Sequence, residues 1–232
     1  SFNFESQSSY SIRIQTSDSG GLTYEKAFTI TIVDVNDTPT DISLSSTSVN
    51  ENASSGTTVG ALSSTDVDAG DSHTYTLVTG TGSTDNVSFA IIGANLNTAA
   101  SFDYETKSSY SIRIRTTDAG GLTYEEVFTI TIVDVNEAPV ITSNSGGSTA
   151  SISYAENSTS TVTTVASSDV DSGSSATYSK SGTDAGVFNI GSSSGALTFA
   201  SPPNYESATD ADGNNTYIVI VTVTDNGSLT DT

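Results

Sequence analysis

Residues 101–139 have the sequence SFDYETKSSYSIRIRTTDAGGLTYEEVFTITIVDVNEAP. Between residues 110 and 115, Tyr110, Ile112 and Ile114 alternate with one Ser and two Arg residues. Residues 128–132 alternate in the same way, with Phe and Ile separated by Thr. A period of two residues is typical of a half-buried β-strand, and the Gly-Gly pair between the two runs favours a tight turn. This stretch therefore predicts a β-hairpin with one apolar face.

The chain repeats this stretch. Residues 1–39 are identical to residues 101–139 at 28 of 39 positions. A third, more divergent copy begins near residue 138, and a repeat of about 100 residues has the size of a domain rather than of a solenoid unit. We therefore predict part of a first repeat at 1–37, a complete second repeat at 38–137, and a third repeat at 138–232 that lacks its last strand.

Further candidate strands lie at residues 41–45, 57–62, 73–78 and 87–92, separated by Gly, Asn, Asp and Ser. No segment shows a sustained helical period. About seven short strands in about 100 residues are typical of a Greek-key sandwich of the immunoglobulin-like type. We expect an all-β chain of such seven-stranded sandwiches arranged end to end.

Composition excludes several classes of function. The 232 residues include 6 Lys and Arg against 27 Asp and Glu, which gives a formal net charge of -21. Such a charge is unfavourable for binding to nucleic acid or to anionic membranes, and it favours cations as partners. The absence of Cys excludes disulfides, thiol catalysis and thiolate metal sites. No stretch approaches the roughly 18 apolar residues of a membrane span, so we expect no membrane insertion within this segment.

The carboxylates concentrate at predicted strand ends and turns. Asp and Asn are common in loops because they cap turns, so a single Asp-x-Asp carries little information. Here the acidic motifs recur in the same order in successive copies. A cluster of ionised carboxylates repels itself unless a cation binds, and Ca2+ takes six to eight oxygen ligands. We therefore expect Ca2+ sites.

The same motifs resemble those of cadherin repeats. Residues 132–139, IVDVNEAP, and residues 34–39, DVNDTP, are similar to the D-x-N-D-x-P linker of that family. Glu51 matches its x-E-x motif and Asp118 its later single aspartate. Two further motifs, D-x-D and D-x-E, are matched by Asp66 with Asp68 and by Asp103 with Glu105.

This resemblance implies calcium bound between successive repeats. For the junction of the second and third repeats, it implies the ligands Glu51, Asp103, Glu105, Asp134, Asn136, Glu137, Asp169, Asp171 and Asp225. For the junction of the first and second, it implies Glu5, Asp34, Asn36, Asp37, Asp66, Asp68 and Asp118. At the far end of the third repeat, it implies a partial set with Glu156 and Glu206.

The near-identical copies, the Thr, Ser and Asp content and the missing Cys resemble cadherin-like repeats of large bacterial surface proteins. We expect a calcium-stiffened extracellular spacer or adhesin at the cell surface. One alternative is a recognition module for a polysaccharide or a cell-surface protein. Another is a subunit of a filament in which copies of the chain exchange strands. Neighbouring repeats of the same chain are expected partners in each case.

We expect no enzymatic activity. His73 is the only histidine, so catalytic triads and multi-histidine sites are excluded, and we expect it to lie in solvent where a strand begins. Asp103 and Glu105 could be read as a glycosidase pair, but equivalents of this pair occur in every copy. The segment Asp210-Ala-Asp-Gly-Asn resembles part of an EF-hand loop, and it is either an additional ion site or a solvated turn.

Overall fold

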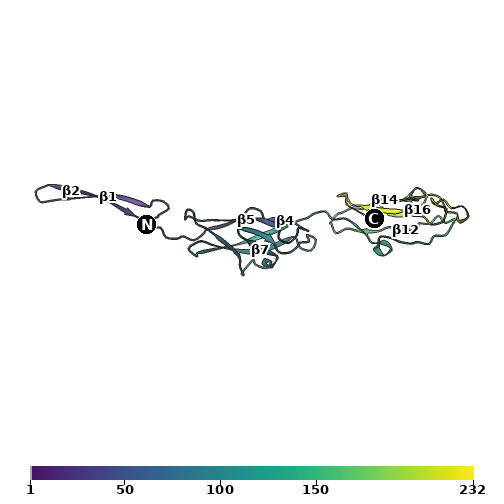
Figure 1. Cartoon of the computed structure of the whole chain (residues 1–232), viewed down its shortest axis with the longest axis horizontal. Coiled ribbons are helices and arrows are strands. Elements are labelled where there is room, and N and C mark those ends of the chain that lie inside the picture. The colour runs from purple at the N-terminus through teal and green to yellow at the C-terminus, as the bar shows by residue number, and fades with distance from the viewer. Residues whose placement is uncertain (1) are drawn as a thin grey trace. The chain divides into compact units, whose positions relative to one another are not determined.

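The computed structural model describes residues 2–232 and divides into two compact units, Ser1–Asp134 and Val135–Thr232. Within the described residues, the regular elements are β-strands and short 3-10 turns. The turns are η1 Asn86–Ser88, η2 Ser143–Gly146, η3 Ala185–Val187 and η4 Tyr205–Ser207. The all-β prediction is therefore confirmed (Figure 1).

The first unit begins with a hairpin of β1, Ser9–Ser17, and β2, Thr23–Thr31. The strands are antiparallel in unbroken register from Ser9 opposite Thr31 to Ser17 opposite Thr23. Its apolar face stays open, since Ile14 is 55% exposed. In the described chain, no second sheet covers this hairpin.

The rest of the first unit is a sandwich of two four-stranded sheets (Figure 1). One sheet has the order β4-β10-β9-β6, and the other has the order β3-β5-β8-β7. The strands are β3 Asp41–Leu44, β4 Ser48–Asn50, β5 Thr58–Thr65, β6 Thr74–Leu77, β7 Phe89–Ile92, β8 Asn95–Thr98, β9 Ser109–Thr117 and β10 Thr123–Val133.

The core of this sandwich contains the alternating residues of β9 and β10. Ile112 and Ile114 are fully buried, and so is Ile130. The rings of Phe89 and Phe102 lie 5.3 Å apart and extend the core at one end. The alternation therefore identifies the buried face correctly, because successive side chains of a strand point to opposite faces.

The first strand of the sandwich crosses from one sheet to the other. Its initial part, β3, pairs antiparallel with β5, and its second part, β4, pairs parallel with β10. The crossing passes Gly60 of β5, where a β-carbon would lie 2.8 Å from the backbone nitrogen of Ser46. The register of β5 with β8 also shifts between Thr58 and Gly60. A glycine is needed here because the two backbones approach each other closely.

The second unit is a looser sandwich of short strands. Its sheets are β11-β13, β12-β16-β15 and β14-β17-β18. The strands are β11 Val140–Ile141, β12 Thr163–Thr164, β13 Ser167–Ser168, β14 Thr177–Ser181, β15 Phe188–Ile190, β16 Ala196–Phe199, β17 Ile220–Thr224 and β18 Thr230–Asp231. Val165, Tyr178 and Val223 form its buried cluster. Phe188, at the position of Phe89 in the repeat, packs against Phe199 with ring centroids 4.4 Å apart.

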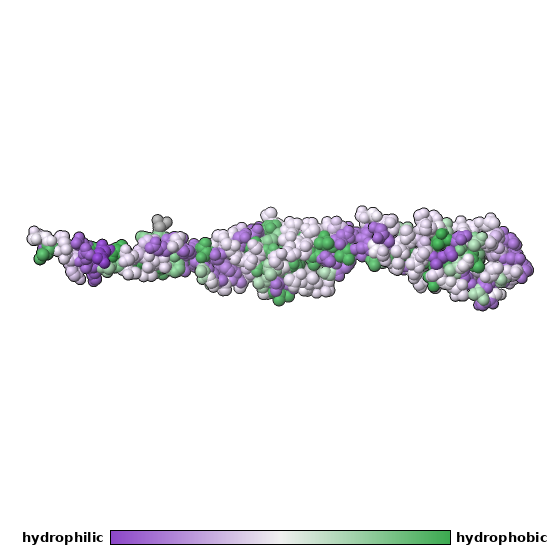
Figure 2. Space-filling view, turned by 90° about the horizontal axis from the view of Figure 1, so that it is seen from above, coloured by the Kyte–Doolittle hydropathy of each residue, from purple (hydrophilic) through white to green (hydrophobic). Residues whose placement is uncertain are grey.

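Figure 2 shows a surface in which polar residues dominate and apolar residues form small separate groups. Among residues 2–232, no helix has both the length and the apolar character that crossing a bilayer requires.

Candidate metal sites

A first group of carboxylates lies around the linker that follows the hairpin. Glu5 precedes β1, Asp34 follows β2, and Asp68 follows β5. One carboxylate oxygen from each of these residues lies within 4.8 Å of the others. Asp68 Oδ1 is buried and accepts no hydrogen bond from the described residues. Three negative charges at this distance repel one another, and a buried carboxylate oxygen without a partner is costly, so the group fits a hard cation.

The linker is attached to the sandwich by two hydrogen bonds. Asn36 Nδ2 donates to Asp118 Oδ2 at 2.9 Å, and the Asp37 backbone N–H donates to Asp68 Oδ2 at 2.7 Å. A β-carbon at Gly120 would displace the Asn36 side chain from this contact.

Asp118 is held in its charged form. It is 6% exposed, and Leu122 N–H donates to its Oδ1 at 2.8 Å. Desolvation raises the pKa of Asp118, but hydrogen bonds from Asn36 and from the backbone N–H groups of residues 120–122 outweigh this effect and lower the pKa below its ordinary value. The sequence motif therefore corresponds to an ionised carboxylate that organises the linker.

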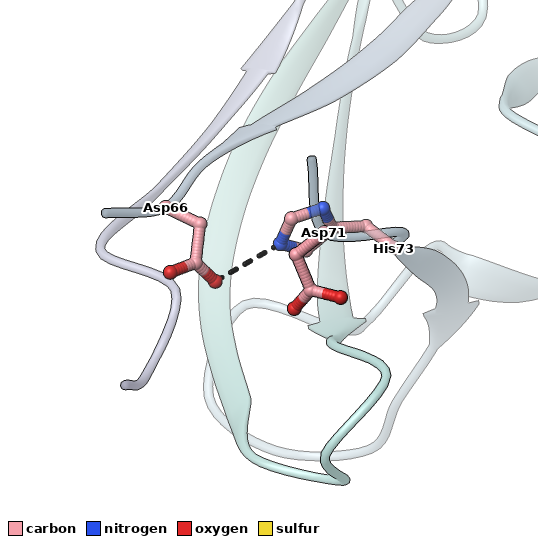
Figure 3. A group of neighbouring side chains, drawn as sticks. All are labelled: Asp66, Asp71 and His73. Atoms are coloured by element: carbon pink, nitrogen blue, oxygen red, sulfur yellow. Dashed lines mark hydrogen bonds and ion pairs between the residues drawn. The ribbon is translucent and has the colours of Figure 1, made fainter. Parts of the chain in front are cut away.

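Asp66 contacts the loop that follows it in the sequence. Its Oδ1 accepts the Asp68 backbone N–H at 3.2 Å, and its Oδ2 lies 3.1 Å from His73 Nε2. The His73 side chain is only 12% exposed. The expectation that His73 lies in solvent is therefore wrong (Figure 3). The loop between β5 and β6 folds back on itself and places the imidazole against the carboxylate.

A second group lies at the other end of the first unit. Carboxylate oxygens of Glu51, Glu105 and Asp134 lie within 4.8 Å of one another. Glu51 is 3% exposed, and its Oε2 accepts the Tyr104 N–H at 2.8 Å. This hydrogen bond directs a buried carboxylate toward the segment that carries Glu105.

In this second group, the negative charges lie close enough together to shift the pKa of one of its carboxyls. A hydrogen bond from its own backbone N–H lowers the pKa of the Glu105 carboxyl. Desolvation and the charges of Glu51, Asp134 and Asp103 outweigh it, so the pKa of Glu105 is raised above its ordinary value. Asp103 itself accepts hydrogen bonds from the N–H and the hydroxyl of Thr106. A bound cation would relieve this repulsion.

The second unit repeats the linker contacts. Asn136 Nδ2 donates to Asp225 Oδ2 at 2.7 Å, and the Glu137 N–H donates to Asp171 Oδ2 at 2.9 Å. The Asp171 N–H in turn donates to Asp169 Oδ1 at 3.1 Å. Desolvation raises the pKa of Asp225, and the hydrogen bonds from Asn136 and from residues 227–229 lower it to a larger extent. Two linkers of related sequence therefore form the same contacts.

At the far end of the third copy, Glu156 Oε2 accepts the Tyr205 N–H at 3.1 Å, as Glu51 does with Tyr104. Glu206 lies in η4, where its N–H donates to the Asn204 side chain at 3.0 Å. Both residues are exposed. The described residues place no third carboxylate with them in a metal-holding group.

In the loop at residues 210–214, Asp210 is buried and residues 211–214 are exposed. Asp210 is 8% exposed, and its Oδ2 accepts the Asn214 N–H at 2.7 Å. The loop is anchored by Asp184, whose carboxylate accepts the N–H groups of Ala211 and Ile218. Sequence reasoning missed Asp184, although Asp85 accepts the Ser111 N–H at the corresponding place in the second copy. Only the alignment of Thr-Asp in residues 84–85 and 183–184 could have indicated it.

Comparison with known proteins gives the same classification. Residues 45–133 match the cadherin domain family. Human Protocadherin-1 is 31% identical over 207 residues, which are 84% of this chain and 19% of that protein. Human Protocadherin Fat 4 is 30% identical over 210 residues, 86% of this chain and 4% of that protein. The chain therefore spans less than a fifth of the length of either relative.

Solved structures agree. The Protocadherin GammaB4 extracellular domain superposes with a TM-score of 0.58 and 26% identity, covering 99% of this chain and 37% of that one. Mouse Cadherin-23 EC22-24 gives a TM-score of 0.57 at 24% identity, covering 99% and 74%.

These matches confirm the cadherin-like β-sandwich and the extracellular location, and the cadherin relatives themselves are non-enzymatic adhesion proteins. Cadherin domains generally bind Ca2+. The relatives named here are human and mouse proteins, so an origin in a bacterial surface protein stays a prediction.

Proposed function

We propose that this cadherin-like chain is a calcium-stiffened extracellular spacer whose repeats support adhesion at the cell surface. The observation that carries the proposal is the approach of Glu5, Asp34 and Asp68 to within 4.8 Å. The first two residues flank the hairpin, and the third belongs to the sandwich beyond the linker. A cation held by all three would join the segments on both sides of the linker.

The charges of Glu5, Asp34 and Asp68 explain why calcium binding would stiffen the linker. Without a cation, the three carboxylates repel one another and favour open arrangements of the linker. Bound calcium supplies the positive charge that removes this repulsion, and its preference for six to eight oxygens suits a carboxylate-rich group. Asn36 and Asp37 already hydrogen-bond to Asp118 and Asp68, so little further ordering of the linker is needed.

We assign the remaining predicted residues to a second calcium site at the next linker. Its first set is the group of Glu51, Glu105 and Asp134, with Asp103 beside it. Its second set follows immediately in the sequence and comprises Asn136, Glu137, Asp169, Asp171 and Asp225. On this assignment, the repeats extend over residues 1–37, 38–137 and 138–232.

The proposed partners are calcium, the neighbouring repeats and other copies of a cadherin-like chain. The repetition without Cys also supports a place in a large bacterial surface protein. A polysaccharide-binding role and a strand-exchanged filament are alternative outcomes of the experiment below.

Small-angle scattering of the full chain tests the proposal, in calcium and then with a chelator. We expect the maximum dimension to be fixed and long with calcium, and broadly distributed after chelation. Asp34→Asn together with Asp68→Asn should remove part of this response, whereas Asp41→Asn, outside both groups, should leave it intact. Identical scattering profiles in both conditions would exclude a calcium-stiffened spacer. Concentration-dependent growth of the particle would instead favour the filament, and saturable binding to cellulose or chitin would favour the recognition module.

A further inference from the structure

The loop that connects β5 and β6 carries a donor set that differs from the carboxylate groups above. Asp66, Asp71 and His73 each offer one atom, and these atoms lie within 4.8 Å of one another. The closest pair is His73 Nε2 and Asp66 Oδ2, at 3.1 Å. Figure 3 shows the two carboxylates and the imidazole turned toward a common region.

The burial of these groups requires an explanation. The side chains of Asp66 and His73 are 3% and 12% exposed. Asp71 Oδ1 accepts the Ser72 N–H at 2.7 Å, but its Oδ2 is buried and finds no hydrogen-bond donor in the described chain. A buried carboxylate oxygen without a partner costs free energy, and such a group in a native structure often marks a ligand. Two carboxylates converge here, and their negative charge favours a cation as the ligand.

The chemistry of the three donors selects the type of cation. Ca2+ and Mg2+ take oxygen ligands, so an imidazole nitrogen would not contribute to their binding. Imidazole with carboxylates suits borderline divalent metals, and Zn2+ is bound by His nitrogen and Asp oxygen. With Zn–ligand bonds of about 2.0–2.2 Å, two ligands of a tetrahedral site lie roughly 3.3–3.5 Å apart. The separation of 3.1 Å between His73 Nε2 and Asp66 Oδ2 is close to that spacing.

The site is also accessible. Asp71 lines an open polar pocket of about 330 Å³ together with Asp34, Asn36, Asp68, Ala69 and Gly70. A cation can therefore reach Asp71, one of the three donors, from this pocket without unfolding of the sandwich. Three protein ligands leave the fourth position of a tetrahedral metal to water, which favours reversible binding.

We propose that Asp66, Asp71 and His73 form a binding site for a borderline divalent metal, with Zn2+ as the best-fitting ion. His73 and Asp71 lie outside the predicted calcium ligands, so this donor set differs from the calcium sites. Asp66 belongs to both sets, so zinc binding is measured in calcium-free buffer.

The single histidine makes the test decisive. The full chain is prepared without a polyhistidine tag, and ZnCl2 is titrated by calorimetry and by NMR of the His73 ring nitrogens. We expect one saturable site and a large change in the Nε2 signal at one equivalent. His73→Gln and Asp71→Asn should each weaken binding at least about tenfold. Asp41→Asn, a carboxylate change in the neighbouring strand β3, should bind Zn2+ as the native chain does.

An unchanged His73 signal at saturation would overturn the proposal, since zinc would then bind to other carboxylates. Unchanged affinity in both variants would overturn it as well. The NMR result is obtained on the native chain, so it remains valid even if a variant folds poorly. An ordinary hydrogen bond between His73 and Asp66 predicts a ring signal that does not respond to Zn2+.

Discussion

Identical residues at the same position of two repeats have different environments in this chain. Ile114 in β9 is fully buried between two sheets, whereas Ile14 occupies the same position of the repeat in β1 and is 55% exposed. The two side chains are chemically identical, so their difference in energy reflects packing alone. This pair allows the contribution of the sandwich core to be measured against an internal control.

Ile114→Ala should lower the stability of the first sandwich by about 2–5 kcal/mol, because it removes buried methylene groups and leaves a cavity. Ile14→Ala should change stability by no more than about 0.5 kcal/mol, because solvent already surrounds the side chain. Urea unfolding, monitored by the hydrogen exchange of backbone amides in β1 and β9, measures both changes in stability. Equal effects of the two substitutions would contradict the burial difference.

The environment of Asp85 makes the stability of the folded chain depend on pH. Burial raises the pKa of Asp85, but the hydrogen bonds from Lys107 and from the Ser111 N–H, with the Lys107 charge, lower it below its ordinary value. The folded state therefore binds this proton more weakly than the unfolded chain, whose Asp pKa is about 3.9. The resulting stabilisation is fully present above the unfolded pKa and is lost as the pH falls through the folded pKa.

Asp85→Asn removes this titration and the ion pair with Lys107. The native chain should be more stable than the variant at neutral pH, and the difference should shrink below about pH 4. Urea unfolding of both proteins across the acid range measures this convergence. A stability difference independent of pH would mean that the Asp85 charge makes no contribution.

At the scale of elements, the sandwich depends on the crossing of its first strand between the two sheets. A β-carbon at Gly60 would lie 2.9 Å from the carbonyl oxygen of Ser46. Gly60→Ala should therefore displace the segment between β3 and β4 and cost about 1–3 kcal/mol, as overpacking does. Gly186→Ala is the matched control, because no atom beyond its own chain neighbours and turn backbone lies within 4 Å of the position of its β-carbon. Thermal unfolding compares the two variants, and equal midpoints would contradict the close approach.

Alternation predicted the strands that place apolar residues on the buried face. It missed β8, whose sequence is Asn-Leu-Asn-Thr. Asn97 and Thr98 are buried there because Asn97 donates to the Gly56 carbonyl and Thr98 donates to the Ser54 carbonyl. Sequence patterns treat such residues as exposed, since their burial depends on partners about 40 positions away. It also missed β4, whose three residues are too few to show a period.

The candidate sites were predictable to a similar extent. Glu51, Glu105 and Asp134 converge as their motifs suggest, because each motif lies at a strand end. The contact of His73 with Asp66 was not predictable. It depends on the path of an irregular loop, in which glycine at position 70 adopts a φ of 89°. Repetition in the sequence therefore identified the charged groups, but not the particular neighbours of each side chain.

For the whole molecule, the formal charge of -21 determines how salt acts on stability. Without divalent cations, screening between about 0.01 M and about 1 M salt shortens the Debye length from about 30 Å to about 3 Å and weakens the repulsion among carboxylates. Added KCl should then raise the midpoint of thermal unfolding. With saturating calcium, the carboxylates instead attract a bound ion, and KCl weakens that attraction.

The salt dependence should therefore change sign on addition of calcium, and calcium at about 100 times its Kd should stabilise the fold by about 2.7 kcal/mol per site. Calorimetric melting of the full chain with chelator and with CaCl2, across a series of KCl concentrations, measures both slopes. Glu105→Gln combined with Asp134→Asn should reduce the calcium-dependent slope, because it removes two charges from one carboxylate group. If KCl raised the midpoint equally in both conditions, calcium would act only by general screening and not through bound ions.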